Sequence, residues 1–347
     1  MTDPTPRVRD LDESELLRRI FPLLPAGDLT DVGPGDDAAV VRAPDGRYVV
    51  TTDVLVEDHH FRRAWSTGYD VGHRAAVQNL ADVAAMGARP TGLVVSLVVP
   101  ADLEVDWVTG LARGLAAAAA PAGAAVVGGD LSGGERVVVA VTAHGDLAGR
   151  APVLRSGARP GDVLAVAGSL GVSAAGLDLL SHGAAEPAAG APGASGPWHP
   201  FVAGYLRPTS PLSAGPAAAD AGATAMLDVS DGLLRDAGRL ARSSGVVVDL
   251  AGGALAWDVT RLVPAAVELA LVDDSVDGPR RAQDWVLSGG EDHGLLATFG
   301  PETADRGLPD GFRVIGDVVA TSADRGPAVL LDGRLPDTTP GWDHFRP

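Results

Sequence analysis

Cysteine and lysine are both absent from the 347 residues, so all 27 basic residues are arginine. Without cysteine the chain has no disulfides, no thiolate nucleophile and no cysteine metal site. Without lysine it has no Schiff-base lysine, no Walker A lysine and no β3 lysine of the kind found in protein kinases. Covalent catalysis through either residue is therefore excluded.

The chain also lacks long apolar runs and an excess of positive charge. No run approaches the ~18 apolar residues of a membrane span, and residues 1–6 lack the basic and apolar regions of a signal peptide. The formal charge of −18 argues against nucleic acid or an anionic membrane as a partner. We expect a cytoplasmic protein in which most acids are solvated, while some cluster, bind divalent cations and so attract phosphate.

Strand and helix patterns alternate along the chain, as in α/β proteins, and the length fits two domains. A glycine-, proline- and arginine-rich break at Ala148–Pro160 predicts domains at 1–150 and 151–347. Residues 183–200 are rich in Ala, Gly and Pro and predict a flexible surface loop. The predicted helices are Asp12–Leu24, Val71–Met86, Trp107–Ala120, Val172–Leu180 and Gly232–Arg242. The predicted strands are Tyr48–Asp53, Leu93–Val99, Val137–Ala143, Val163–Ala167, Ala225–Leu227, Val246–Leu250 and Leu295–Phe299.

Residues 33–38 match the dinucleotide pattern G-x-G-x-x-A, but the context is wrong for it. Such a turn should follow a strand and open a helix, whereas this segment runs into Ala39-Val-Val and an apparent hairpin at Pro44–Gly46. Its two acids, Asp36 and Asp37, would repel a bare pyrophosphate. The segment either presents them to a metal ion or forms a surface Asx turn.

Polar residues close the predicted strand at Thr51-Thr52-Asp53, where open α/β sheets gather ligands. Their hydroxyl, carbonyl and carboxylate oxygens suit magnesium. The histidines at 59 and 60 follow on an irregular segment, where neighbouring side chains point in different directions. They do not by themselves indicate zinc.

Further acids recur beside predicted elements in both halves. Asn79 and Asp82 share a helix face that points either to solvent or to a metal cluster. Asp130 lies in a glycine-rich loop after a strand, where backbone N–H groups can approach phosphate. Asp228 ends a strand before Ser230 and Asp231, one of which reads as the N-cap of the next helix. Acids also follow the flexible diglycine of Leu287–His293.

These segments, in this order, resemble the thiamine-monophosphate kinase family, within the superfamily that includes aminoimidazole ribonucleotide synthetase. The resemblance covers nearly the whole chain. The segments that carry it are Gly35–Ala38, Thr51–Asp53 with His60-Phe61, Asn79–Gly87, Gly128–Asp130, Arg155–Asp162, Asp228–Leu233, Ser288–Asp292 and Gly341–Phe345. The family departs from this chain at Asp58-His59 and at His293-Gly294, where it usually has a small pair and Tyr-Glu.

The resemblance implies an α/β, mixed-sheet, two-domain fold of the aminoimidazole ribonucleotide synthetase type, whose N-terminal domains pair in a homodimer. The N-terminal domain would bind metal and ATP, and the C-terminal domain would complete the active-site cleft. The implied magnesium ligands are Asp37, Thr51, Thr52, Asp53, Asp82, Asp130, Asp228 and Asp231. The implied ATP contacts are Gly129, Asp130, Arg155 and Ser230, and His60, Glu291 and Trp342 would hold thiamine monophosphate.

The implied reaction is direct transfer of the γ-phosphoryl group of ATP to thiamine monophosphate. The attacking phosphate, with a second pKa of ~6, is already ionised and needs no general base. Selenophosphate synthetases and the hydrogenase maturation relative need residues that are absent here. Two alternatives stay open: an activity like that of aminoimidazole ribonucleotide synthetase, and a non-catalytic nucleotide- or metal-binding module.

Overall fold

The computed structural model describes residues 6–24, 26–34, 39–185 and 200–342. Contacts divide the chain into two compact units. The first takes in Met1–Val83 and Arg89–Ala148, and the second takes in Ala84–Ala88, Gly149–Glu186 and Trp198–Pro347. No helix of the described ranges is long and apolar enough to cross a membrane.

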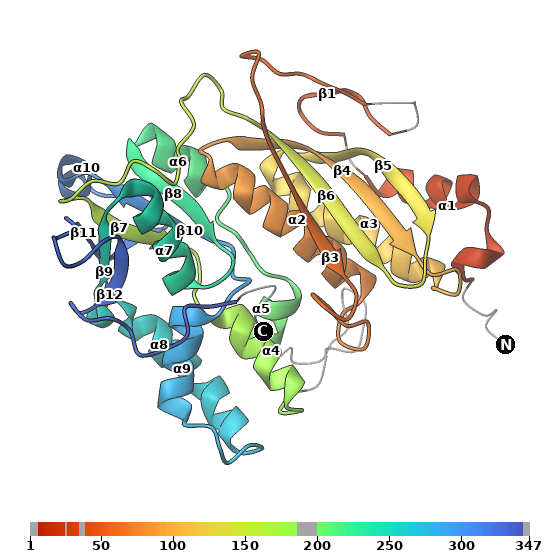
Figure 1. Cartoon of the computed structure of the whole chain (residues 1–347). Coiled ribbons are helices and arrows are strands. Elements are labelled where there is room, and N and C mark those ends of the chain that lie inside the picture. Colours follow the sequence, from red (N-terminus) through yellow and green to blue (C-terminus); the bar gives the residue numbers. More distant parts are fainter. Residues whose placement is uncertain (1–5, 25, 35–38, 186–199, 343–347) are drawn as a thin grey trace. The chain divides into compact units, whose positions relative to one another are not determined.

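The first unit is built on a four-stranded sheet in the order β3-β6-β4-β5. Its strands are β3 (Val49–Val56), β4 (Arg89–Val99), β5 (Ala125–Gly133) and β6 (Val138–Asp146). β6 runs antiparallel to both β3 and β4, whereas β4 and β5 are parallel. Because parallel strands need a long crossover, the helix α3 (Val105–Ala119) joins β4 to β5. Figure 1 shows α3 and α2 (Gly68–Ala85) along the same face of this sheet.

Glycines allow α2 and α3 to pack with their backbones in close contact. A Cβ atom on Gly72 would lie 2.0 Å from the carbonyl oxygen of Leu111, and one on Gly114 would lie 2.1 Å from that of Tyr69. No side chain fits at such distances, so the spacing of the two helices depends on these glycines.

The opposite face of the same sheet is open in this unit. Val50 and Val54 of β3 point to that face and are 56% and 44% exposed. Leu55, which points to the helices, is 1% exposed. Tyr48 lies just before β3, is 63% exposed and has its ring 5.6 Å from that of His144 on β6. An apolar, aromatic surface therefore remains uncovered.

The remaining elements of the first unit are short. They are η1 (Val8–Asp10), α1 (Glu13–Ile20), η2 (Phe21–Leu23), β1 (Thr30–Val32), β2 (Val40–Val41) and η3 (Ala120–Ala122). The Asp12 carboxylate caps α1 by accepting the Glu15 N–H at 2.7 Å. A turn does form before Gly46, but β2 pairs with β1 while β3 pairs with β6. The predicted hairpin is therefore wrong.

The second unit is built on a six-stranded sheet in the order β12-β9-β11-β7-β10-β8, in which only β12 and β9 are parallel. Its strands are β7 (Val163–Ala167), β8 (Ala223–Val229), β9 (Val247–Leu250), β10 (Gly294–Phe299), β11 (Phe312–Val319) and β12 (Ala328–Leu331). Its helices are α4 (Val172–Ser181), α5 (Pro200–Leu206), α6 (Ala214–Asp220), α7 (Leu233–Ser244), α8 (Gly252–Ala270), α9 (Gly278–Ser288) and α10 (Pro301–Arg306).

Small residues bring the helix α6 close to this sheet. Ala214 and Ala218 of α6 are buried in one cluster with Met226 of β8 and Phe299 of β10. The Phe299 ring meets that of Phe312 edge to face at 5.3 Å. α7 packs against β8, β9 and β12, and α8 packs against β11. The ends of β8 and β10 are thus held in a packed core, and the loops that follow or precede them carry the predicted acids.

Candidate metal and nucleotide site

The polar residues of β3 lie inside the strand and not at its end. β3 continues three residues beyond Asp53, so the predicted boundary is wrong. The Thr51 hydroxyl donates to the Asp82 carboxylate at 2.8 Å, which places both on the side of α2. Side chains alternate along a strand, so Asp53 lies on that side too. Thr52 lies on the other side, where its hydroxyl donates to the carbonyl of Val141 at 3.0 Å.

The helix face of Asn79 and Asp82 points to β3 and not to solvent. Asn79 is fully buried, and its amide group donates to the carbonyl of Ala75 at 2.9 Å. Its side-chain oxygen accepts the Asp53 N–H at 3.0 Å. Because β3 is an edge strand, that N–H points away from the sheet and takes its partner from α2. The structure thus places Thr51, Asp53 and Asp82 on the same side of β3.

Gly129 and Asp130 belong to the strand β5, so the predicted glycine-rich loop is wrong. A Cβ atom on Gly129 would lie 2.0 Å from the carbonyl oxygen of Val95, and this close approach requires glycine there. Asp130 is exposed and accepts a hydrogen bond from the Ser132 hydroxyl at 3.1 Å. Gly129 therefore allows a close strand pair at the edge of the sheet, and the exposed Asp130 follows it on β5.

An apolar cavity of about 710 Å³ borders β5 and includes Gly129 and Asp130 in its wall. Aliphatic side chains of α1, α3 and β4 supply most of the rest. They include Leu17, Ile20, Val95, Leu97, Val108, Leu111 and Leu115. An apolar wall beside one carboxylate suits a flat, mostly uncharged group attached to a charged one. The sequence patterns assigned these side chains to helix and strand faces but did not indicate a cavity.

One ring nitrogen of His60 already has a hydrogen-bond partner. Its Nδ1 accepts the backbone N–H of Val56 at 3.0 Å, so the neutral ring carries its proton on Nε2. Beside it, Glu57 is buried, and its carboxylate accepts the Val137 N–H at 2.9 Å and a hydrogen bond from Arg63. These contacts fix the segment after β3 and the tautomer of the neutral His60 ring.

In the second unit, the loop between β8 and α7 carries Asp228, Ser230 and Asp231. Asp228 is the next-to-last residue of β8 and is 4% exposed. Neither Ser230 nor Asp231 caps α7, contrary to prediction, because Gly232 holds the N-cap position. The Asp236 carboxylate instead accepts the N–H groups of Ser230 and Asp231 at 3.0 and 2.9 Å. A side chain of α7 thus fixes the loop that precedes the helix through two hydrogen bonds.

Asp236 is fully buried, and burial followed by the nearby charge of Asp228 raises its pKa to about 7. The Arg239 guanidinium bridges Asp236 and Asp231. Sequence reasoning missed this residue. The sequence did contain an indication of its role, because Asp236 interrupts the apolar stripe of α7, and a buried charge there needs hydrogen-bond or charge partners.

Two other segments pack onto this loop. The N–H of Glu291 donates to the carbonyl of Ser230 at 2.7 Å, and the N–H of Trp342 donates to that of Asp231 at 3.0 Å. Trp342 is 52% exposed, so its ring is accessible within this unit. The structure therefore gathers Asp228, Ser230, Asp231, Glu291 and Trp342 from three distant parts of the sequence, and Arg155 lies on another loop of the same unit.

His293 is buried between two acids of this group. Its Nδ1 lies 3.4 Å from Asp228 Oδ2, and its Nε2 lies 3.6 Å from Glu291 Oε2. Burial alone would lower the pKa of His293. The hydrogen bond to Asp228 and the nearby charge of Glu291 outweigh that effect and raise the pKa to about 10. The imidazolium therefore partly neutralises the two acids.

The Asp292 carboxylate anchors the segment between Glu291 and His293. It is 3% exposed and accepts the N–H groups of Gly171 and Ser173 at the start of α4. Burial raises the pKa of Asp292 to about 7. The residues on either side adopt left-handed backbone angles, with φ of +69° at Glu291 and +52° at His293. Such angles persist only where the surroundings impose them.

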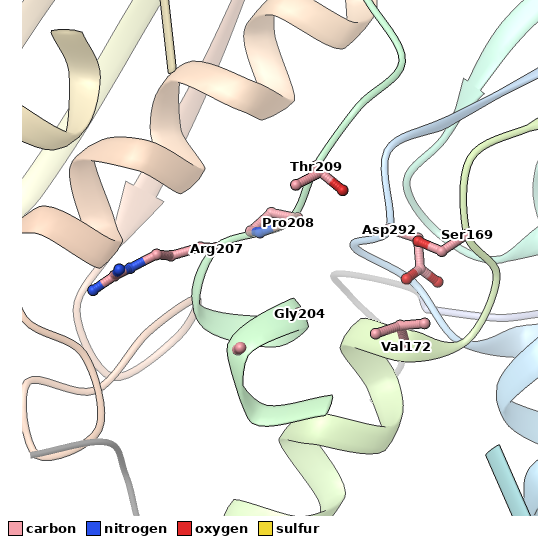
Figure 2. A pocket seen from close by; sticks show the side chains of 8 residues that line it. Ser169, Val172, Gly204, Arg207, Pro208, Thr209 and Asp292 are labelled. Atoms are coloured by element: carbon pink, nitrogen blue, oxygen red, sulfur yellow. The ribbon is translucent and has the colours of Figure 1, made fainter. Parts of the chain in front are cut away.

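A second cavity, of about 310 Å³, lies beside Asp292. Figure 2 shows Asp292, Ser169 and Thr209 around one part of it, while Arg207 extends away from them. Val172 and Gly204 complete the wall from the two neighbouring helices, α4 and α5. The cavity thus places polar groups next to the segment that carries Glu291.

Comparison with known proteins relates the chain to one group of enzymes. The family described as "AIR synthase related protein, N-terminal domain" matches residues 35–147. The chain is 47% identical over 316 residues to the thiamine-monophosphate kinase of Mycobacterium tuberculosis, covering 90% of this chain and 86% of the relative. The chain belongs to the thiamine-monophosphate kinase family. The predicted resemblance is therefore confirmed.

Solved structures of thiamine-monophosphate kinases share the fold. That from Stenotrophomonas maltophilia aligns with a TM-score of 0.75 at 29% identity, covering 93% of this chain and 96% of the other. A structure described as AaThiL complexed with AMPPCP and TMP aligns with a TM-score of 0.70 at 30% identity, covering 99% of this chain and 100% of that one. The predicted α/β fold of the aminoimidazole ribonucleotide synthetase type is confirmed.

The oxygen-rich donor sets suit the magnesium expected of a thiamine-monophosphate kinase. Among the described residues, no group of three or more acids or histidines converges closely enough to hold a metal ion. Asp37, a predicted ligand, lies outside those residues. Magnesium commonly binds through one or two carboxylates and completes its shell with phosphate and water. Thr51, Asp53 and Asp82 in the first unit, and Asp228 and Asp231 in the second, fit that mode of binding.

Proposed function

We propose that this protein is an ATP-dependent kinase that converts thiamine monophosphate to thiamine diphosphate in the cytoplasm. The main support for the proposal is the set of oxygen-bearing side chains on the side of β3 that faces α2, together with Asp130 in the wall of an apolar cavity. Membership of the thiamine-monophosphate kinase family supports the choice of substrates, because the AaThiL relative is described with AMPPCP and TMP.

ATP is proposed to bind along β5. The apolar cavity accepts the adenine ring, and the backbone of Gly129, which lies in the cavity wall, contacts the phosphates. Asp130 lies next to both and holds a magnesium ion that accompanies the phosphates. A carboxylate alone would repel ATP, so this position makes sense only with a cation between the two.

The roles of the residues follow the family assignment. The proposed magnesium ligands are Asp37, Thr51, Thr52, Asp53, Asp82, Asp130, Asp228 and Asp231. The hydroxyl of Thr52 faces away from the other proposed ligands of β3, so the assignment of Thr52 rests on the family resemblance alone. The proposed ATP contacts are Gly129, Asp130, Arg155 and Ser230, and those to thiamine monophosphate are His60, Glu291 and Trp342.

The proposed reaction requires the protein mainly to position the two substrates and to neutralise the charge of their phosphates. The acceptor is a phosphate oxygen that is largely ionised at neutral pH, so no side chain has to remove a proton from it. His60 carries its proton on Nε2 and can donate it to an anionic oxygen. Trp342, half exposed, can cover the cationic thiazolium, a contact worth ~1–2 kcal/mol when desolvated. Magnesium, when bound, neutralises charge that develops on the transferred phosphoryl group.

We also propose that the protein is a homodimer formed through the first unit. The support is the uncovered face of its sheet, where Tyr48, Val50 and Val54 are exposed together. An exposed apolar sheet face of this kind typically marks an interface. A second copy of the same face would cover it symmetrically.

Phosphorus NMR tests the proposed reaction directly. Purified protein is incubated with ATP, magnesium and thiamine monophosphate. Equal amounts of ADP and thiamine diphosphate are expected. Formation of ADP with free phosphate, or no change while ATP still binds, would contradict the substrate assignment and favour another activity of the superfamily.

A further inference from the structure

The hydroxyl of Ser244 makes three hydrogen bonds to one loop of the second unit. Ser244 is the last residue of α7. Its hydroxyl accepts the N–H groups of Gly157 and Ala158 at 3.1 and 3.2 Å and donates to the carbonyl of Arg155 at 3.0 Å. A serine hydroxyl has one proton and two lone pairs. All of its hydrogen-bonding capacity is thus spent on the backbone of residues 155–158.

The same loop is held on its other side by β8. A Cβ atom on Gly157 would lie 2.1 Å from the carbonyl oxygen of Thr224, so the loop presses directly on that strand. Asp162 then accepts the Arg159 N–H at 2.9 Å and the Thr224 hydroxyl at 2.7 Å. The loop backbone is therefore fixed at both ends, whereas the Arg155 side chain is exposed.

We infer that Ser244 is a positioning residue for Arg155 in nucleotide binding. The inference rests on the proposed function, in which Arg155 contacts ATP. The Ser244 hydroxyl donates to the carbonyl of Arg155 and so fixes the backbone from which the Arg155 side chain extends. Ser244 itself touches neither substrate. Its effect on ATP passes through the loop.

The energetic reason is the cost of ordering a loop when a ligand binds. A loop that is already fixed loses little backbone entropy on binding, whereas a loose one loses more and binds less tightly. Removing the hydroxyl leaves two N–H groups and a carbonyl without their partner. They can turn to water, and the loop then samples other conformations. Affinity for ATP should fall, while the first unit is untouched.

The experiment measures binding of AMPPCP with magnesium by calorimetry, and stability by thermal melting. Ser244→Ala is expected to raise the Kd for AMPPCP about five- to tenfold, the equivalent of about one lost hydrogen bond. Ser243→Ala is the matched control, because Ser243 is the exposed neighbour on the same helix. It should leave the Kd unchanged. Ser244→Thr retains the hydroxyl and should stay within about twofold.

The decisive comparison adds Ser244→Ala to Arg155→Ala. If Ser244 acts through Arg155, the double variant should bind AMPPCP no more weakly than Arg155→Ala alone. An equal loss in both backgrounds, or an unchanged Kd in folded Ser244→Ala, would overturn the inference. If Ser244→Ala does not fold, Ser244→Cys is compared in its place, with the same expectation. Binding of AMPPCP without turnover of thiamine monophosphate would overturn only the substrate assignment. No binding by the unaltered protein would overturn both.

Discussion

Replacing Asp82 with asparagine removes a charge from the proposed metal site and preserves the shape of the side chain. The Asp82 carboxylate accepts the Thr51 hydroxyl at 2.8 Å, and the amide oxygen of asparagine can accept the same hydrogen bond. We therefore expect the free energy of unfolding to change by less than about 1 kcal/mol. Two unit charges 4 Å apart interact by ~4 kcal/mol at an effective dielectric of 20, so the loss of this charge should lower turnover by about 10³.

The assay compares the rate of ADP formation, in the presence of thiamine monophosphate, with the thermal melting midpoint. Asp82→Asn should lose turnover while its midpoint stays within about 3 °C of the unaltered protein. Asp106→Asn is the control, because it removes one charge from an exposed position on α3 of the same unit. A folded Asp82→Asn protein with normal turnover would refute the assignment of Asp82 as a ligand.

Three further predictions concern packing, pH and assembly. Gly72→Ala should lower the free energy of unfolding by ~3 kcal/mol or more, because its Cβ would lie 2.0 Å from the Leu111 carbonyl oxygen. Gly253→Ala is the control, because the space around Gly253 is open. Equal denaturation midpoints for the two variants would disprove the packing argument. The pKa of Asp292 is about 7 in the folded state, above its ordinary 3.8, so the folded protein holds this proton more tightly than the unfolded chain. The protein should therefore lose about 4 kcal/mol of stability as the pH rises from 4 to 7. Asp292→Asn should not show this loss, and parallel curves of stability against pH for the two proteins would contradict the assignment. Val50→Asp should give monomers in light scattering, and a persistent dimer would rule out the proposed interface.

Apolar periodicity predicted many helices and strands of the correct type, but α8, α9, β11 and β12 were not predicted and some boundaries were wrong. Thr51 to Asp53 resembled the end of a strand because they are polar, whereas β3 continues and its polar residues are matched by partners on α2. Gly128 to Asp130 resembled a loop because glycine is rare in strands. Here glycine is needed for the close approach to β4. In both places a tertiary contact overrides a local preference.

The candidate site was predictable as a set of residues but not as an arrangement. The acids could be identified because the family motifs contain them. The contacts that hold them could not, because they come from residues distant in sequence, such as Trp342 at Asp231. Asp236 was missed although it interrupts the apolar stripe of α7, because its partners include the backbone N–H groups of Ser230 and Asp231, which no motif specifies. Asp37 stays a prediction, because it lies outside the described residues.

The proposed magnesium ligands of the first unit have little freedom to adapt to an ion of the wrong size. Thr51 and Asp53 lie in the middle of β3, Asp130 lies within β5, and Asp82 is tied to Thr51 on a helix packed through glycines. Oxygen ligands surround magnesium at about 2.0–2.1 Å but calcium at about 2.3–2.6 Å, and calcium also takes more of them. Flexible loops could absorb that difference, whereas a sheet resists it. The protein should therefore discriminate against calcium by stiffness alone.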